Sequence, residues 1–245
     1  MIEKKTLRAE LKRRRADFVA AIPDEVRALL FNRPPGAIAD LVPEGAVVSV
    51  FHEMADEVPA SNYARWFHER GHRIALPWFA ARGAPMAFRE WANPFDDGLL
   101  VPDPYSALQP AADAALLVPD VMFCPLLGFT SAGGRIGYGA GFFDRWLAAH
   151  PPRLAIGLAW DCQLVDELPL EPHDAALDAI GEAQRALHGR LEVDGVDMEV
   201  LLQHEVVIVE HLAELGGEAF AVEQILDADR APGNLVLVGR TDAAP

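Results

Sequence analysis

The chain has 245 residues, 51% of them hydrophobic and 24% charged, and its formal net charge is −16 at pH 7. This length can bury a sizeable core in one large domain, or in a domain with an appendage. The acidic balance argues against a nucleic-acid-binding protein, and the absence of any run of about eighteen apolar residues argues against a membrane span.

The first expected element is a basic amphipathic helix over residues 2–20. Its charged start, Met1–Lys5, differs from a secretory signal, so we expect a cytoplasmic protein. Lys4, Arg8 and Lys12 recur every four residues and should share one face of the helix. A basic run on a helix usually faces solvent, and the pattern alone favours this reading.

The rest of the chain alternates strands and helices. Helices are expected over 24–32, 60–71 and from the glycines to residue 150, and strands over 46–51, 73–77, 86–89 (at a sheet edge), 120–125 and 153–160. This order favours an α/β fold with a layered, mainly parallel sheet flanked by helices. Residues 93–112, rich in Pro and Asp, are expected to form a long surface loop that could cover a site. Cys124 and Cys162 lack metal or redox spacing and are expected to be buried free thiols.

A glycine-rich segment, Gly134–Arg145, carries the strongest chemical signal. Its glycines at 137, 139 and 141 let backbone N–H groups approach a ligand, and the helix that follows adds donors suited to phosphate. Arg135 offers a fork for phosphate oxygens, and Asp144 could hold Mg²⁺. These parts predict a nucleoside triphosphate site. The spacing G-x-G-x-G fits neither the dinucleotide motif nor the P-loop, so a plain strand-to-helix turn is the alternative.

Residues 118–145 resemble the signature of the 5-formyltetrahydrofolate cyclo-ligase family, which reads roughly P-L-L-A-F-D-x-x-G-x-R-L-G-Y-G-G-G-Y-Y-D-R. Lys4–Leu11 is similar to the opening helix of that family, with its K-x-x-x-R pair. Residues 156–178 are similar to its closing block, including Glu171-Pro172-His173-Asp174. The three matches occur in the family's order and cover about residues 1–185.

The resemblance implies the ATP-dependent cyclisation of 5-formyltetrahydrofolate to 5,10-methenyltetrahydrofolate, a step of one-carbon metabolism that releases ADP and phosphate. The implied partners are small molecules, ATP and 5-formyltetrahydrofolate or its polyglutamylated forms, with Mg²⁺ as cofactor. Arg135 would act in catalysis, and its side chain is expected to face the ligand and to add little to stability. Asp144 would bind the metal, and Met54 and Glu57 the folate. The residues implied to bind nucleotide are Lys4, Arg8, Gly134, Arg135, Ile136, Gly137, Tyr138, Gly139, Gly141 and Phe142.

Several readings remain open on the residues themselves. Glu57 could instead stabilise the start of the next helix. The apolar residues Phe51, Met86 and Trp91 could line the folate pocket with Met54 or simply pack in the core. His173 with Asp174 and Asp178 could suggest a metal cluster, but a structural Asp–His pair fits better beside Pro172.

The sequence departs from the family pattern at Thr130, Phe143 and Trp78. Thr130 stands where an Asp is usual and is expected to keep a capping oxygen.

Residues 186–245 have no recognised counterpart and form an acidic extension, with twelve Asp or Glu against three Arg from residue 190 onward. A strand is expected at 234–238, and a helix or strand at 198–215. Since anionic substrates would be repelled by this charge, the extension is expected to lie away from the site.

Two other functions are compatible with these observations. The chain could be a family relative that binds a nucleotide or a folate-like ligand without cyclo-ligase turnover. A dehydrogenase-like α/β enzyme is disfavoured because G-x-G-x-x-G is missing.

Overall fold

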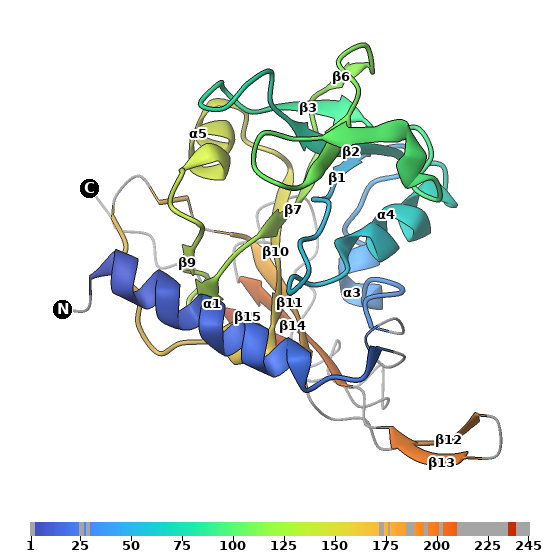
Figure 1. The fold of residues 1–245 in the computed structure, drawn as a ribbon, viewed down its shortest axis with the longest axis vertical. Coiled ribbons are helices and arrows are strands. Elements are labelled where there is room, and N and C mark those ends of the chain that lie inside the picture. The colour runs from blue at the N-terminus through green and yellow to red at the C-terminus, as the bar shows by residue number, and fades with distance from the viewer. Residues whose placement is uncertain are drawn as a thin grey trace.

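The computed structural model describes residues 3–24, 27, 30–171, 174–175, 177–184, 189–193, 196–200, 203–209 and 235–238. Its centre is a mixed sheet flanked by helices (Figure 1). The strands lie in the order β15 (Leu235–Val238), β14 (Gln203–Val209), β11 (Ala179–Gln184), β10 (Leu154–Trp160), β7 (Val121–Pro125), β1 (Val47–Ser49), β2 (Arg73–Trp78), β3 (Ala87–Glu90) and β6 (Leu116–Leu117).

The sheet is mainly parallel, as predicted. The pairs β1–β2, β1–β7, β7–β10, β10–β11 and β14–β15 are parallel. The pairs β2–β3, β3–β6 and β11–β14 are antiparallel. The prediction that the strand near 86–89 lies at the edge is wrong, because β6 pairs outside it. Strands β14 and β15 of the extension continue the sheet beyond β11.

The helices cover both faces of this sheet. They are α1 (Lys4–Ala20), α3 (Gly36–Ala39), α4 (Ala60–His68) and α5 (Phe142–Ala149). Helices α3 and α4 lie on one side of β7 and β10, and α5 lies on the other, while α1 runs past β9 at one end (Figure 1). None of the described helices has the length and apolar character needed to cross a bilayer.

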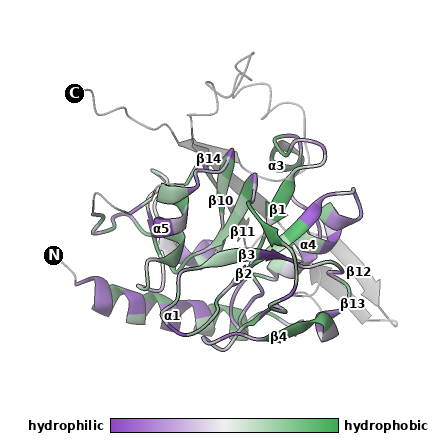
Figure 2. Ribbon diagram, turned by 90° about the horizontal axis from the view of Figure 1, so that it is seen from above, coloured by the Kyte–Doolittle hydropathy of each residue, from purple (hydrophilic) through white to green (hydrophobic). Residues whose placement is uncertain are grey.

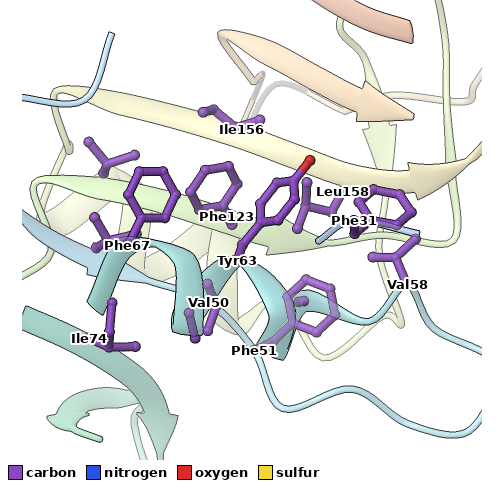
Figure 3. Close-up of a cluster of buried hydrophobic side chains, with 14 of the residues drawn as sticks. Phe31, Val50, Phe51, Val58, Tyr63, Phe67, Ile74, Phe123, Ile156 and Leu158 are labelled. Carbon is purple, nitrogen blue, oxygen red and sulfur yellow. The ribbon is translucent and has the colours of Figure 1, made fainter. Parts of the chain in front are cut away.

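The alternation of side-chain direction along the central strands explains why helices pack on both faces of the sheet. Phe123 of β7 packs against α4, with its ring 5.4 Å from that of Tyr63 and 5.6 Å from that of Phe67 (Figure 3). Its neighbours Met122 and Cys124 point to the other face and share a cluster with Leu147 of α5. Successive strand residues face opposite sides, so an unbroken apolar run here means burial on both faces. Figure 2 shows these strands as hydrophobic and most of α1 as hydrophilic.

Three short hairpins and two 3₁₀ turns complete the described structure. The hairpins are β4 (Leu100–Pro102) with β5 (Leu108–Pro110), β8 (Gly128–Phe129) with β9 (Arg135–Ile136), and β12 (Gly189–Val193) with β13 (Val196–Val200). The turns are η1 (Asp97–Leu99) and η2 (Asp161–Gln163). The segment 93–112 is therefore not a plain loop, because it contains η1 and the β4–β5 hairpin.

The other predicted boundaries agree to within a few residues. The helix predicted at 60–71 ends at His68, and its last turn is closed by Gly71 with a φ of 84°. The helix predicted at 24–32 falls partly on residues 25, 26, 28 and 29, which lie outside the described residues. Helix α3 was not predicted. Both cysteines are free, with Cys124 buried and Cys162 half-buried.

Candidate active site

The candidate site lies where the parallel strands β1, β7 and β10 end. Ligands in such sheets gather beyond the carboxyl ends of the strands. The glycine segment follows β7, the loop carrying Met54 and Glu57 follows β1, and η2 follows β10. Helix α1 packs against η2, and Arg14 of α1 donates a hydrogen bond to the Leu164 carbonyl at 2.9 Å.

The glycine segment begins as the β8–β9 hairpin. The Thr130 N–H donates to the Gly134 carbonyl at 2.9 Å, and the Gly134 N–H donates to Thr130 Oγ1 at 3.2 Å. The expected capping oxygen at Thr130 is therefore confirmed. A Cβ on Gly134 would lie 2.7 Å from Leu170 Cδ1 and 3.0 Å from Thr130 Oγ1, so a larger residue there would require the Leu170 side chain to shift. Ile136 is buried beside Leu7 and Leu11, which leaves only its backbone free to meet a ligand.

Two glycines of the segment adopt a backbone conformation that other residues avoid. Gly139 has a φ of 99° and Gly141 a φ of 65°, and Gly141 precedes the first turn of α5. Glycine reaches positive φ without steric cost, so these two positions let the chain turn sharply into the helix. The unpaired N–H groups of that first turn are donors suited to an anion.

Helix α1 brings its basic face to this segment. Arg8 Nε donates to the Gly137 carbonyl at 2.9 Å, and a Cβ on Gly139 would lie 3.1 Å from Arg8 Cζ. The Lys12 ammonium lies 5.2 Å from the centre of the Tyr138 ring. Lys4 points elsewhere and binds Glu171 and Asp174 at 2.8 Å each. Arg8 and Lys12 thus both contact the glycine segment, while Lys4 contacts Glu171 and Asp174.

Arg135 is buried rather than exposed to a ligand. The residue is 5% exposed, and its Nη2 donates to Asp144 Oδ1 at 2.6 Å. Asp144 Oδ1 also accepts the Ala175 N–H at 3.2 Å. Arg135 Nε is buried with no hydrogen-bond partner among the described residues. The expectation that Arg135 adds little to stability does not fit this burial, because its removal would strip Asp144 of its charged partner.

The other half of the site centres on Glu57, which is also buried, with 7% of its surface exposed. Its Oε2 accepts the Met54 N–H at 2.9 Å, and its Oε1 accepts the Tyr138 hydroxyl. Burial raises the pKa of Glu57, and the hydrogen bonds from Met54 and Tyr138 only partly oppose this shift. The helix-stabilising reading of Glu57 is wrong. Glu53 takes that role, accepting the Ser61 N–H at 3.1 Å in the first turn of α4.

Arg15 joins the two halves, and the sequence reasoning missed it. Its Nε and Nη2 donate to the two oxygens of Asp56 at 3.1 and 2.9 Å, and its Nη1 donates to the Tyr138 hydroxyl at 2.8 Å. The general expectation that a basic run on a helix faces solvent is wrong for Arg15 of this helix, because the residue is 2% exposed. A signal was present in the sequence. Arg15 continues the four-residue spacing of Leu7 and Leu11, which are buried on the same side of α1.

A cleft of about 500 Å³ opens beside this network. It is lined by two segments, His52–Ala55 and the β4–β5 hairpin, of which Pro102, Ser106, Ala107 and Leu108 take part. Met54 lines this cleft, and part of the segment 93–112 forms another side of it. Phe51 and Trp91 are buried in one core cluster and Met86 in another, so these three pack in the core.

An aromatic contact links the hairpin to the glycine segment. Tyr105 of the hairpin lies 5.3 Å from Phe142, the first residue of α5, and Phe79 packs against both rings.

Two of the residues that depart from the family pattern, Phe143 and Trp78, pack against neighbouring side chains. The Phe143 ring lies 6.5 Å from Phe88, and the Arg89 guanidinium lies 4.3 Å from the centre of the Trp78 ring.

The expected closing block is only partly described. His173 and Pro172 lie outside the described residues. Asp174 binds Lys4, and Asp178 accepts the Ala155 N–H at 2.8 Å, which ties the segment before β11 to β10. Among the residues that the structure describes, no three His, Cys, Asp or Glu side chains gather as a metal site.

Comparisons with known proteins give a consistent result. A model of the 5-formyltetrahydrofolate cyclo-ligase family matches residues 1–182. The chain is 31% identical over 139 residues to the 5-formyltetrahydrofolate cyclo-ligase of Escherichia coli K12, covering 54% of this chain and 75% of that one. It is 28% identical over 179 residues to the enzyme of the same name from Mycolicibacterium smegmatis, covering 68% of this chain and 89% of that one. The NMR structure of Aquifex aeolicus 5,10-methenyltetrahydrofolate synthetase shares the fold, with a TM-score of 0.57 at 21% identity over 74% of this chain and 90% of that one.

Proposed function

The chain belongs to the 5-formyltetrahydrofolate cyclo-ligase family, a family of ligases, and on this premise we propose that it cyclises 5-formyltetrahydrofolate to 5,10-methenyltetrahydrofolate at the expense of ATP. The observation that carries the proposal is the hydrogen bond from the Tyr138 hydroxyl to Glu57. It brings the segment suited to phosphate next to the loop beside the cleft, so that two substrates bound there could meet. We place the reaction in residues 1–185, with 186–245 as an acidic extension, and in the cytoplasm, where free thiols persist.

The proposed chemistry needs no nucleophile from the protein. The formyl oxygen of the substrate attacks the γ-phosphorus of ATP, and the bond to ADP breaks with its electron pair staying on ADP. N10 of the folate then attacks the activated formyl carbon and loses its proton, and the C–O bond breaks to release phosphate. The protein must align two substrates and balance charge on the transferring phosphoryl group, so positioning and electrostatics supply the rate enhancement.

The nucleotide half supplies donors and positive charge. The proposed cradle is the backbone of Gly134–Gly141 with the first turn of α5, and Arg8 lies across it. Lys4 would add a cationic contact to phosphate in exchange for its present carboxylate partners, whereas Arg135 would keep its bond to Asp144. Arg135 is the proposed catalytic residue, because its unpartnered Nε can meet charge that develops on the phosphoryl group. Phe142 and Tyr138 would border the nucleotide.

Asp144 fits the role of a Mg²⁺ ligand. Mg²⁺ is usually held by one or two carboxylates together with substrate phosphates and water, so no protein cage is needed. Both hydrogen bonds to the Asp144 carboxylate fall on Oδ1. Its Oδ2 lies on the side of Gly141 at the start of α5. Bound there, the ion would neutralise charge on the phosphates.

The folate half would use the cleft beside Met54. Its apolar lining, with Leu108 and Pro102 opposite Met54, suits the flat rings of a folate. Glu57 lies behind Met54 and would accept hydrogen bonds from the amino-substituted pterin or from N10. Because the carboxyl group is already bonded to Tyr138 and the Met54 N–H, its orientation is fixed before the substrate arrives.

The test is an absorbance assay for methenyltetrahydrofolate with purified protein and 5-formyltetrahydrofolate. We expect product only when both Mg²⁺ and ATP are present, and no product when ATP is replaced by ADP. Folded protein that gives no methenyl band at high enzyme concentration would contradict the proposal.

The alternative is a relative that binds the ligands without turnover. The observation that favours it is that Lys4 and Arg135 both already carry carboxylate partners. Titration calorimetry distinguishes the two functions. Heat on adding nucleotide and folate, with no methenyl product in the same sample, would support binding without catalysis.

A further inference from the structure

A buried polar network connects three segments that meet beside the proposed site. Its members are Arg15 of α1, Asp56 and Glu57 of the loop after β1, and Tyr138 of the glycine segment. The Arg15 side chain is buried, and each of its guanidinium nitrogens already donates a hydrogen bond to Asp56 or Tyr138. Its partners belong to different halves of the site, since Tyr138 lies in the nucleotide half and Asp56 is adjacent to Glu57 in the folate half.

The bonds form a continuous path across the site. Arg15 Nη1 donates to the Tyr138 hydroxyl at 2.8 Å, and that hydroxyl donates to Glu57 Oε1. Glu57 Oε2 in turn accepts the N–H of Met54, which lines the cleft. Arg15 also donates hydrogen bonds from Nε and Nη2 to both carboxylate oxygens of Asp56. A shift of Tyr138 would therefore disturb the residue that lines the folate cleft.

Burying an arginine restricts the arrangements that the surrounding segments can adopt. Burying a guanidinium is strongly unfavourable unless its charge and its donors find partners. The planar fork of Arg15 meets Asp56 and Tyr138 at once only while the two segments keep their present relation. The Asp56 backbone is held as well, because its carbonyl accepts the Trp160 indole N–H at 3.1 Å. Alternative positions of the glycine segment would leave Arg15 buried with an unpaired donor.

We propose that Arg15 is a positioning residue that couples the nucleotide half of the site to the folate half through Tyr138 and Asp56. Folate bound against Met54 and Glu57 would hold Tyr138 in place and so order the glycine segment for ATP. By linkage, ATP would tighten folate binding by the same factor. The catalytic consequence rests on the proposed function, whereas the coupling of the two segments does not.

Three substitutions test the coupling, and each removes a different part of the network. Arg15→Met keeps an unbranched side chain but removes the guanidinium group with every donor. Arg15→Lys keeps the charge but cannot bind Asp56 and Tyr138 with one planar fork. Tyr138→Phe removes a single hydroxyl and covers the case in which Arg15→Met does not fold. The control is Arg13→Met on the same helix, where the arginine is exposed and binds only Asp17 among the described residues.

The first measurement is hydrogen exchange in the protein without ligands. We expect Arg15→Met and Tyr138→Phe to speed exchange several-fold in peptides covering both 51–58 and 134–141, with Arg13→Met unchanged. Unchanged exchange in the glycine segment would overturn the proposal. Faster exchange throughout β7 and β10 as well would also overturn it, because Arg15 would then support general stability only. Hydrogen exchange tests the coupling even if the wild-type protein makes no methenyl product. The lack of product would contradict only the proposed function.

The second measurement is calorimetry with a non-hydrolysable ATP analogue and Mg²⁺, with and without saturating 5-formyltetrahydrofolate. In the wild-type protein we expect folate to tighten the Kd of the analogue at least about fivefold. In Arg15→Lys and Tyr138→Phe the factor should fall below about two. Turnover should show kcat lowered by about 10- to 100-fold with smaller changes in KM, as expected for misalignment. Wild-type coupling in folded variants, or no coupling in the wild-type protein, would overturn the proposal.

Discussion

The two ends of the candidate site each contain a buried arginine beside a carboxylate, but the two arginines differ in how completely they are bonded. Arg15 uses Nε, Nη1 and Nη2 on Asp56 and Tyr138. Arg135 uses Nη2 on Asp144, and its buried Nε has no partner among the described residues. A buried donor without a partner costs free energy and is expected where a ligand completes the bonding. The difference is consistent with the two roles that we propose, Arg135 in catalysis and Arg15 in positioning.

The largest effect that would test this comparison is expected from Arg135→Ala. Loss of a charge-assisted contact of about 1.5–3 kcal/mol should lower ATP-dependent turnover roughly 10- to 100-fold. Stability should also fall, by about 1–3 kcal/mol, since Asp144 loses its charged partner. The measurements are steady-state kinetics and urea unfolding, with Arg13→Ala as the exposed control. A variant that loses stability but keeps wild-type turnover would show that Arg135 has only a structural role.

A smaller effect is expected in the nucleotide half from Gly139→Ala. The backbone there has a φ of 99°, and the new Cβ would meet the Arg8 guanidinium at 3.1 Å. We expect the KM for ATP to rise by about tenfold, or about 1.4 kcal/mol, with a strain cost of about 1–2 kcal/mol in stability.

The matched control is Gly71→Ala, at a φ of 84° with no atom within 4 Å of the new Cβ. It should show the strain cost without a change in the KM for ATP. Equal kinetics in the two variants would place the nucleotide away from Gly139.

The folate half can be tested by its pH dependence. Burial raises the pKa of Glu57 above its ordinary value of 4.5, so the folded state holds its proton more tightly than the unfolded state. The corresponding stability is present below pH 4.5 and is lost as the pH rises through the folded-state pKa. Glu57→Gln should remove this slope from urea unfolding measured across pH. Exposed Asp17→Asn should keep it, and an unchanged slope in Glu57→Gln would show that Glu57 does not titrate in this way.

The smallest effect is expected at the hairpin that carries Arg135. Thr130→Val removes the oxygen that accepts the Gly134 N–H and should cost about 1 kcal/mol of stability. Turnover should stay within a few-fold, because the hydroxyl does not face either proposed substrate half. Thr130→Ser keeps the acceptor and should restore stability. A tenfold loss of turnover in the Val variant would show that the hairpin itself takes part in the reaction.

Much of the architecture followed from local patterns. The apolar runs near 120–125 and 153–160 are buried on both faces of the sheet as β7 and β10, and they are long enough to be recognised alone. The glycines at 139 and 141 take the positive φ that their residue type permits. The extension was harder to place, because β14 and β15 acquire partners only through pairing with β11 and with each other.

The site shows the limit of local patterns most clearly. By itself the sequence determined the succession of strands and helices along the chain, the glycine turn into α5 and the basic face of α1, because each depends on neighbours within a few residues. Only the tertiary structure decided that Arg15 is buried between Asp56 and Tyr138, that Glu53 rather than Glu57 caps α4, and that the β4–β5 hairpin walls the cleft. These outcomes depend on contacts between residues up to 123 positions apart, such as Arg15 with Tyr138. The spacing of Leu7, Leu11 and Arg15 marks the buried side of α1, but the partners found across such distances are set by packing, which no local pattern of residues records.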